Sequence, residues 1–266
     1  MKLILIPPYQ NPVVKVNFLL REIVDNLEKK EQLEGVEVDI DEGYPVESPS
    51  ETRDEEFFAG VRVGIIKKVK EYSETGKYDA ILSTCGVDPG FAAARLVSKI
   101  PFEGVIHSSV HVASLIGERF SLIHTVASSS LTLKHCVESY GFGHKLASVR
   151  FLGRSSTSMY GLIHKYKKEE RIKVPEITKI IDDFVTQCTA AIEKDRADSI
   201  IFGGEPQQIF ADVVRQKLDE AGYSEIPIIC GVSAGVAMAK AMVNMKLVKA
   251  PRAYPSASLK AKPEYW

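Results

Sequence analysis

Residues 80–90 read Ala-Ile-Leu-Ser-Thr-Cys-Gly-Val-Asp-Pro-Gly, an apolar run that passes into a glycine-containing turn. The run has the length and apolar content of a buried strand, and the residues that follow it, Phe91–Lys99, have the pattern of a helix. The second half of the chain repeats this arrangement at Ile200–Pro206, where another apolar run ends at Gly203-Gly204-Glu205. Two copies of a strand, a turn and a helix indicate an internal duplication.

Short apolar runs alternate with longer amphipathic stretches along the rest of the chain. The runs expected as strands are Leu3–Ile6, Val36–Ile40, Tyr78–Ser83, Gly104–His107, Phe120–Thr125, Ala147–Leu152, Ser199–Phe202 and Ile226–Cys230. The stretches expected as helices include Val14–Lys30, Glu55–Thr75, Ser130–Ser139, Pro175–Lys194, Gln207–Ala221 and Ser233–Met245. This alternation predicts an α/β protein with parallel sheets covered by helices. The polar stretch Gly153–Lys173 is the best candidate for a mobile connection or lid.

The composition is that of an ordinary globular protein, with 45% apolar and 26% charged residues in a chain of 266. The formal net charge is -1, from 34 basic and 35 acidic side chains, and this balance favours neither nucleic acid nor a membrane as a partner. No segment approaches the ~20 apolar residues of a membrane span, and the N-terminal apolar run is too short for a signal peptide. Four widely spaced cysteines favour reduced thiols and a cytoplasmic location.

The sequence contains no motif for a cofactor or a metal ion. The first strand is not followed by a GxGxxG turn and no P-loop is present, so we expect no nucleotide cofactor. The cysteines form no CxxC pair and no zinc-type spacing with histidine. His107 and His111 fit no metal pattern with a carboxylate, and we assign no metal site.

Cys85 is the strongest candidate for a catalytic side chain. It follows a predicted buried strand at the carboxyl edge of a parallel sheet, where α/β proteins bind ligands. Gly86 allows close approach of the backbone. The helix that follows offers N–H groups and a partial positive charge, which favour a thiolate and bind a substrate oxygen. The alternative is that Cys85 is a small apolar residue that ends a strand, since free cysteines are often buried.

The segment Cys85–Gly90, together with the alanine-rich helix that bears Arg95, resembles the hydantoin and allantoin racemases of the Asp/Glu racemase superfamily. The likeness extends to residues 118–123, 197–203 and 226–237, and is weakest at 154–173 and in the tail. The resemblance implies two pseudo-symmetric, Rossmann-like α/β/α lobes with parallel sheets and an active-site cleft between them. The first lobe would comprise residues 1–106 and 233–266, and the second lobe residues 107–232.

The same resemblance implies two catalytic cysteines, one in each lobe, on opposite faces of the substrate's acidic carbon. At the second position the chain reads Gly203-Gly204-Glu205, so Gly204 stands where the family has cysteine. Glu205 is the substitute base that we expect, because burial at a strand end raises the pKa of a carboxyl group toward the working range. Two other interpretations stay open: Glu205 caps the following helix, and Cys230 supplies the second acid/base.

Further residues at strand ends are candidates for binding the substrate. Tyr9 and Asn11 follow the first strand, where the family has a polar turn, and they either bond a substrate oxygen or shape the turn. His124 and Thr125 end the strand that begins at Phe120. His124 either acts as an acid/base or orients the substrate, with a structural histidine as the alternative. The other candidates lie in the two turns: Gly86, Val87, Asp88, Gly203 and Gly204.

The leading hypothesis is a cofactor-independent racemase or isomerase that acts on a small amino-acid-derived carbon acid or hydantoin, with Cys85 as the catalytic thiol. Because the second cysteine is missing, two alternatives stay open. One is a single-thiol decarboxylase, lyase or (thio)hydantoin-directed hydrolase or desulfurase on the same scaffold. The other is a non-catalytic small-molecule binding protein. In each case the partner is a small molecule, and a homo-oligomer is left open.

Overall fold

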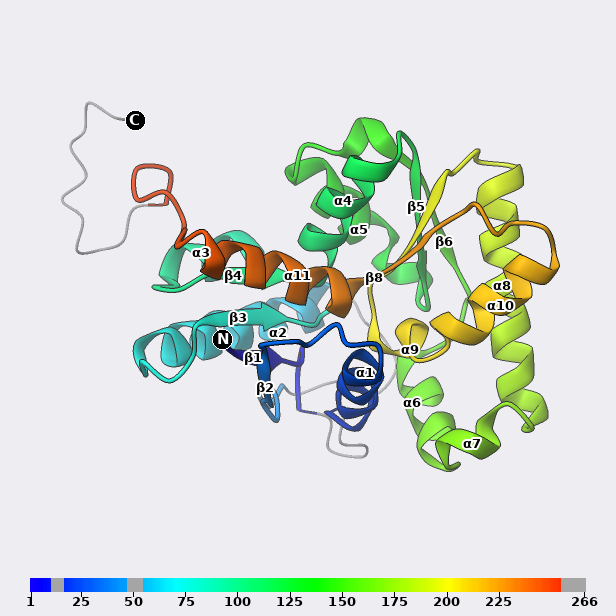
Figure 1. Cartoon of the computed structure of the whole chain (residues 1–266), viewed down its shortest axis with the longest axis horizontal. Coiled ribbons are helices and arrows are strands. Elements are labelled where there is room, and N and C mark those ends of the chain that lie inside the picture. The colour runs from blue at the N-terminus through cyan, green and yellow to red at the C-terminus, as the bar shows by residue number, and fades with distance from the viewer. Residues whose placement is uncertain (11–16, 47–54, 255–266) are drawn as a thin grey trace.

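Two parallel four-stranded sheets form the centre of the chain in a computed structural model, which describes residues 1–10, 17–46 and 55–254. The first sheet has the order β2 (Glu37–Ile40), β1 (Lys2–Ile6), β3 (Ala80–Ser83) and β4 (Phe102–Gly104). The second has the order β6 (Leu146–Phe151), β5 (Phe120–His124), β7 (Ser199–Phe202) and β8 (Ile228–Cys230). Both sheets therefore follow one order, in which the second strand lies outside the first and the third and fourth continue the sheet. The shared order agrees with an internal duplication and confirms the predicted α/β fold of two lobes (Figure 1).

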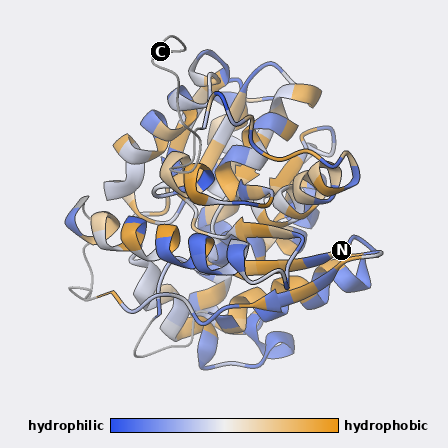
Figure 2. Cartoon of the chain, turned by 90° about the vertical axis from the view of Figure 1, so that its left-hand side faces the viewer, coloured by the Kyte–Doolittle hydropathy of each residue, from blue (hydrophilic) through white to orange (hydrophobic). Residues whose placement is uncertain are grey.

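The third strand of each sheet is buried along its whole length. All four residues of β3 and all four residues of β7 are inaccessible to solvent. Helices cover both faces of a parallel sheet, which is why these strands are continuous apolar runs and do not alternate with polar residues. Figure 2 shows the same distribution, with hydrophobic strands inside and helices that have one hydrophilic side. Burial of these strands fixes the position of the turns that follow them.

Helices surround both sheets (Figure 1). Those of the first half, together with the last helix of the chain, are α1 (Asn17–Lys29), α2 (Glu55–Glu74), α3 (Phe91–Val97) and α11 (Gly231–Asn244). Those of the second half are α4 (Val105–Ile116), η1 (Ala127–Ser129), α5 (Ser130–Ser139), η2 (Gly143–Lys145), α6 (Ser156–His164), α7 (Lys168–Arg171), α8 (Pro175–Glu193), α9 (Glu205–Gln208) and α10 (Ala211–Glu220). The helix predicted from Val14 begins at Asn17 within the described residues, and Pro175 is the first residue of α8, where its missing N–H costs least.

Residues 104–107 were expected to be a strand, and this prediction is wrong. The strand β4 ends at Gly104, and α4 begins at the next residue. The cause is a tertiary contact: the carboxylate of Asp88 accepts hydrogen bonds from the backbone N–H groups of Ile106 and His107, at 3.3 and 2.7 Å. These are N–H groups of the first helical turn, which need a partner from outside the helix. The local preference of Val105 and Ile106 for a strand is overridden.

The polar stretch 153–173 was expected to be a mobile connection or lid, but it contains the helices α6 and α7. The hydroxyl of Ser155 accepts the N–H of Ser158 and caps α6. The short helix α7 is tied to the first lobe, because Arg171 Nη1 lies 2.6 Å from a carboxylate oxygen of Glu22 on α1, and both side chains are largely buried. The segment therefore connects the second lobe to α1 of the first lobe.

The predicted helix Gln207–Ala221 is two helices in the structure. The short helix α9 begins two residues earlier, at Glu205, and α10 begins at Ala211. Phe210 lies between them and packs its ring 6.4 Å from the ring of Phe184 in the core of the second lobe. The burial of this ring accounts for the break.

The predicted lobe boundaries at residues 106/107 and 232/233 lie inside α4 and near the start of α11, and these two helices pack against each other. The division of the chain into lobes at these residues stays a prediction. Within the described ranges, none of the helices combines the length and the apolar content that crossing a membrane would require.

Candidate functional site

The turns after β3 and β7 meet where the two lobes join. Cys85 is the second residue after β3, and Gly204 is the second residue after β7, so the two positions correspond in the repeat. The backbones of the two turns are in contact at the next residue, Gly86. A Cβ atom built on Gly86 would lie 3.1 Å from both the Cα and the N of Gly204. A side chain at Gly86 would push the two turns apart. The turn that contains Cys85 and the turn that contains Gly204 therefore form one site.

A small cavity lies between these turns and has a volume of about 40 Å³. Its lining residues come from both lobes: Pro8, Phe58, Cys85, Gly86, Val87, His124, Thr125, Val126, Ser129, Ser156, Tyr160, Gly204, Glu205, Pro206 and Gln207. This volume holds a few water molecules and is well below the ~300 Å³ of the smaller ligand pockets. The site is therefore closed in this structure, with its lining residues packed close together.

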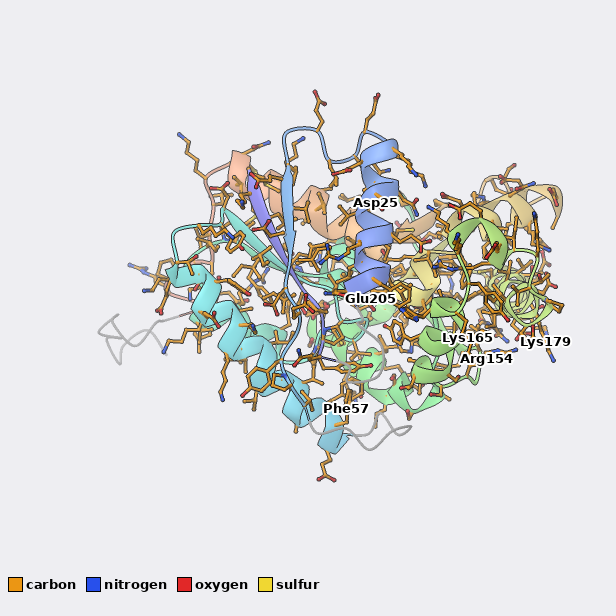
Figure 3. The ribbon with its side chains drawn as sticks, turned by 90° about the horizontal axis from the view of Figure 1, so that it is seen from below. Asp25, Phe57, Arg154, Lys165, Lys179 and Glu205 are labelled. Atoms are coloured by element: carbon orange, nitrogen blue, oxygen red, sulfur yellow. The ribbon has the colours of Figure 1, made fainter. Side chains whose placement is uncertain are left out.

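Glu205 is the buried carboxylate of this cavity, with 3% of its surface exposed. The Thr84 hydroxyl lies 2.9 Å from its Oε1 and the Tyr160 hydroxyl lies 3.1 Å from its Oε2. Thr84 precedes Cys85 in the first lobe, whereas Tyr160 belongs to α6 of the second lobe. Figure 3 shows Glu205 at the centre of the molecule, between the lobes. The carboxyl group is held by one hydroxyl from each lobe and stands beside the cysteine turn.

His124 and Thr125 bring two further polar side chains to the cavity. The ring Nδ1 of His124 accepts the backbone N–H of Val126 at 3.3 Å, which places the proton of a neutral ring on Nε2. That Nε2 faces the cysteine turn, 3.3 Å from where a Cβ of Gly86 would stand. Thr125 Oγ1 lies 3.0 Å from the hydroxyl of Ser156 on α6. A histidine donor and a pair of hydroxyls thus lie on the side of the second lobe.

The structure brings most of the predicted site residues together. Those that line the cavity are Cys85, Gly86, Val87, His124, Thr125, Gly204 and Glu205. Three others are not among its lining residues. Gly203 lies just before the second turn, Tyr9 is buried with its ring against Phe57 at 5.3 Å, and Asp88 points toward α4. Asn11 lies outside the described residues.

Asp88 holds the two lobes together at the start of α4. Besides the two backbone N–H groups of α4, it accepts the hydroxyl of Tyr140, the residue that follows α5, at 3.1 Å. Its backbone has a positive φ of 43°, which is unusual for a residue other than glycine, and Gly104 has no side chain that would collide with the carboxylate. Burial without a cationic partner raises the pKa of Asp88 to about 7.

The raised pKa of Asp88 predicts a pH dependence of stability. The folded chain holds this proton up to about pH 7, whereas the unfolded chain loses it near its ordinary value of 3.8. The folded state therefore binds more protons between these values, and the stability that the carboxyl contributes is lost as the pH rises from about 4 to 7. We expect Asp88→Asn to reduce this slope by up to about 1.4 kcal/mol per pH unit, measured by urea unfolding at pH 5, 6 and 7. An unchanged slope would show that Asp88 does not titrate in this range.

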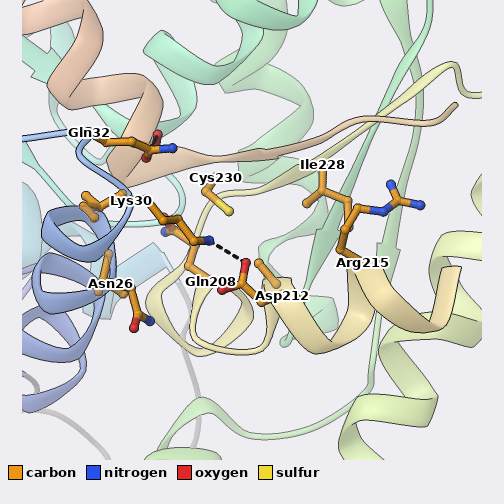
Figure 4. Close-up of a pocket in the computed structure, with 12 residues that line it drawn as sticks. Asn26, Lys30, Gln32, Gln208, Asp212, Arg215, Ile228 and Cys230 are labelled. Atoms are coloured by element: carbon orange, nitrogen blue, oxygen red, sulfur yellow. Dashed lines mark hydrogen bonds and ion pairs between the residues drawn. The ribbon is translucent and has the colours of Figure 1, made fainter. Parts of the chain in front are cut away.

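Cys230, the alternative second acid/base, does not line the cavity that contains Cys85. It lines a separate cavity of about 190 Å³ between α1, α10 and β8, shown in Figure 4. That cavity is crossed by an ion pair between Lys30 and Asp212 at 2.5 Å. Burial raises the pKa of Cys230 to about 12, which disfavours a thiolate. The structure thus places this thiol apart from the first one.

Four polar residues of the cavity were not predicted from the sequence: Ser129, Ser156, Tyr160 and Gln207. Tyr160 was overlooked because its segment is rich in serine and lysine. A signal was present, since Ser155 is a helix-capping residue and Met159, Tyr160 and Ile163 follow it at the spacing of a buried helix face. Gln207 could also have been predicted as a site residue, because it lies three residues after Gly204 on a predicted helix.

A family model described as Asp/Glu/Hydantoin racemase matches residues 19–239 of the chain. This match covers both sheets except for β1, and it includes both turns of the site. The chain belongs to this family, which confirms the resemblance seen in the residues that follow Cys85.

Curated relatives of known name support a finer placement. A hydantoin racemase of Pseudomonas sp. (strain NS671) is 29% identical over 182 residues, which are 68% of this chain and 65% of that protein. A hydantoin racemase of Rhizobium meliloti is 29% identical over 181 residues, which are 68% of this chain and 66% of that protein. The matched part thus spans just under two thirds of either relative.

Solved structures share the fold. An allantoin racemase from Klebsiella pneumoniae superposes with a TM-score of 0.74 at 19% identity, with 98% of this chain and 96% of that chain covered. A glutamate racemase from Bacillus anthracis superposes with a TM-score of 0.56 at 14% identity, with 92% and 82% covered. At these identities the likeness shows the two-lobed fold alone.

No cluster of three or more His, Cys, Asp or Glu side chains that would suit a metal ion occurs in residues 1–10, 17–46 and 55–254. The buried pair His107 and Glu103, 2.9 Å apart, is completed by the hydroxyl of Ser108 at 3.2 Å and lies on α4 and β4, among residues that do not line the cavity. These contacts stabilise the lobe junction.

Proposed function

We propose that the protein is an isomerase that moves a proton at the acidic carbon of a small amino-acid-derived ring such as a hydantoin, without a cofactor. The observation that carries this proposal is that Cys85 of the first lobe and Glu205 of the second lobe line one cavity. A thiol and a carboxyl group are both able to accept and donate a proton near neutral pH when a protein adjusts their pKa values. Family membership supports the same class of reaction.

In the proposed reaction the Cys85 thiolate removes the proton from the α-carbon and leaves an enolate. The protonated carboxyl group of Glu205 then delivers a proton to the opposite face, so one proton is taken up and one is released. Backbone N–H groups of Gly86, Val87 and Gly204 are the donors that we assign to the developing enolate oxygen. For the other enantiomer the two groups exchange roles, and the reaction therefore needs no external base.

The polarity of the cavity favours an uncharged substrate. Among its described lining residues there is no lysine or arginine, and one lining residue, Glu205, carries a carboxyl group. A substrate carboxylate would meet no cationic partner there, and burial of an unpaired charge is costly. Ring amides supply N–H and C=O groups that suit the hydroxyls of Thr125, Ser156 and Tyr160. We therefore place hydantoins before free amino acids and malonates as substrates.

The size of the cavity adds a condition to this proposal. A five-membered ring with a side chain does not fit into about 40 Å³, so the lobes or their side chains have to separate before the substrate enters. Closure afterwards excludes water and brings the thiol and the carboxyl group to the ring. Thr84 and Tyr160, which bond Glu205 from both lobes, close together with it.

A second candidate is supported by Gly204, which has no thiol at the position that corresponds to Cys85. A single thiol either delivers a proton to one face, as a decarboxylase of the same scaffold would require, or attacks a ring or thiocarbonyl carbon, as a hydrolase or desulfurising lyase would require. Polarimetry with single enantiomers of a panel of 5-substituted hydantoins separates the two candidates. Loss of rotation with an unchanged molecule supports the isomerase. An arylmalonate is assayed in parallel. Loss of carbon dioxide from the arylmalonate, or opening of the hydantoin ring, would replace the isomerase by the single-thiol reaction.

A further inference from the structure

Two buried polar atoms of the cavity lack a hydrogen-bond partner. Within the described ranges, four buried side-chain nitrogen or oxygen atoms are unpaired: Ser83 Oγ, Ser129 Oγ, Gln207 Oε1 and Arg215 Nε. Ser129 and Gln207 both line the cavity that contains Cys85. An unsatisfied buried acceptor is costly and therefore rare in folded proteins. Two of them in one small cavity indicate that a ligand completes their hydrogen bonds.

The carboxamide of Gln207 is held in one orientation. Its Nε2 donates to the backbone carbonyl of Ile123 at 3.4 Å, and its side chain is fully buried. The neighbouring glutamine, Gln208, differs in this respect, because its Nε2 donates to the carbonyls of Gly203 and Gly204 and its Oε1 accepts the N–H of Val232. Gln208 therefore supports the turn, whereas Gln207 lines the cavity and its oxygen has no partner among the described residues.

The same carboxamide occupies the space that a side chain at position 204 would need. A Cβ atom built on Gly204 would lie 2.6 Å from Gln207 Oε1 and 3.2 Å from both Cδ and Nε2. Gly204 corresponds in the repeat to Cys85, so the amide stands on the side of the cavity where the second thiol is missing. A side chain at position 204 would therefore displace the carboxamide of Gln207.

We infer that Gln207 replaces the missing second thiol by a recognition group: its Oε1 accepts a hydrogen bond from a ring N–H of the substrate, and the Ser129 hydroxyl bonds a second polar atom of the same ring. This inference rests on the proposed function and names the residue that selects its substrate. An amide oxygen is too weak a base to take a proton from carbon, so acid/base work on this side stays with Glu205. A substrate without the N–H leaves Oε1 buried and unpaired, which is the condition that gives strong discrimination.

Binding of unsubstituted hydantoin and of its 1-methyl and 3-methyl derivatives tests this inference. Isothermal titration calorimetry is performed on the full chain, on Gln207→Met, on Ser129→Ala and on the control Gln216→Met, which alters an exposed glutamine of α10. Wild type and the control are expected to bind hydantoin at least about tenfold more tightly than one of the two methylated rings. Gln207→Met is expected to lose this preference, and Ser129→Ala to bind all three rings more weakly.

Thermal unfolding of the ligand-free variants distinguishes a ligand-binding role of Gln207 from a structural role. Methionine has a similar volume and removes the unpaired acceptor, so Gln207→Met is expected to unfold at the same or a higher temperature than wild type. A clear drop in the unfolding temperature together with unchanged preference for the N–H ring would overturn the inference. So would a wild type that binds the three rings alike or not at all.

Turnover of a 5-substituted hydantoin is measured separately. Binding selectivity without turnover refutes the proposed function alone. Turnover with a binding selectivity that Gln207→Met does not change refutes this inference alone.

Discussion

Cys85→Ser is expected to lower kcat/KM for hydantoin racemisation by about 10³-fold while the fold is retained. Serine fills nearly the same space in this buried turn, but an alcohol ionises many pH units above a thiol and cannot hold or return the α-proton near neutral pH. General acid/base groups contribute about 10² to 10⁴ to a rate, and Cys85 is assigned to the step in both directions. The loss is expected in kcat more than in KM, because the thiol acts on the transition state.

Cys230→Ser is the matched control for this prediction. It makes the same change of sulfur to oxygen in the separate cavity between α1 and α10, and activity is expected to stay within about twofold of wild type. If Cys230→Ser lost activity as strongly as Cys85→Ser, the second acid/base would be Cys230, and the assignment of Glu205 would be wrong. If neither change affected turnover, thiol chemistry would have no part in the reaction.

Glu205→Gln is expected to reduce racemisation by about 10²- to 10³-fold and to make the site one-sided. The amide has the shape of the carboxyl group, and the hydroxyls of Thr84 and Tyr160 are able to turn so that each still forms a hydrogen bond with it. The fold should therefore persist, whereas the proton for the second face is lost. In deuterated water the variant is expected to exchange the α-proton of one enantiomer, through Cys85, without inverting it.

Tyr160→Phe tests whether the carboxyl group of Glu205 has a catalytic or a structural role. It removes one hydrogen bond from Oε2 of Glu205 and leaves the carboxyl group in place. Loss of a donor destabilises the carboxylate, so the limb of the pH–rate profile that depends on Glu205 is expected to move to higher pH. This is the acidic limb for the enantiomer that Glu205 deprotonates, and the alkaline limb for the enantiomer that Cys85 deprotonates. A structural Glu205 would give the same profile as wild type in Tyr160→Phe, with a change in stability only. Full racemisation by Glu205→Gln would remove Glu205 from the mechanism.

The sequence predicted those parts of the fold that depend on local composition. The apolar runs that became β3 and β7 are buried at every residue, so their burial could be anticipated from hydrophobicity alone. Residues 199–202 and 130–139 were predicted with the bounds that the structure has. For 199–202 the cause is a clear change of composition at both ends, from Asp198 to the apolar run and from the run to Gly203. The rule that parallel strands present their carboxyl ends at one edge predicted a ligand site at each turn, whereas the meeting of the two turns was implied by the family resemblance.

Other features depended on contacts between distant residues and escaped this reasoning. The helix α4 starts immediately after a strand because Asp88, 18 residues away from Ile106, supplies the acceptors for its first N–H groups. Tyr160 reaches Glu205 across 45 residues from a segment that its serines and lysines made look irregular. The unpaired oxygen of Gln207 is defined by what surrounds it, and no local pattern encodes such an absence.

Proton NMR in deuterated water, with each pure enantiomer of a 5-substituted hydantoin in turn, tests the central claim most directly. The α-proton signal of either enantiomer is expected to disappear while the rest of the spectrum is unchanged, and chiral chromatography of the product is expected to show both enantiomers with deuterium at the α-carbon. Deuterium uptake from both sides requires two acid/base groups, which are assigned to Cys85 and Glu205. A new carbon skeleton, or exchange that proceeds with one enantiomer and never inverts it, would contradict the account.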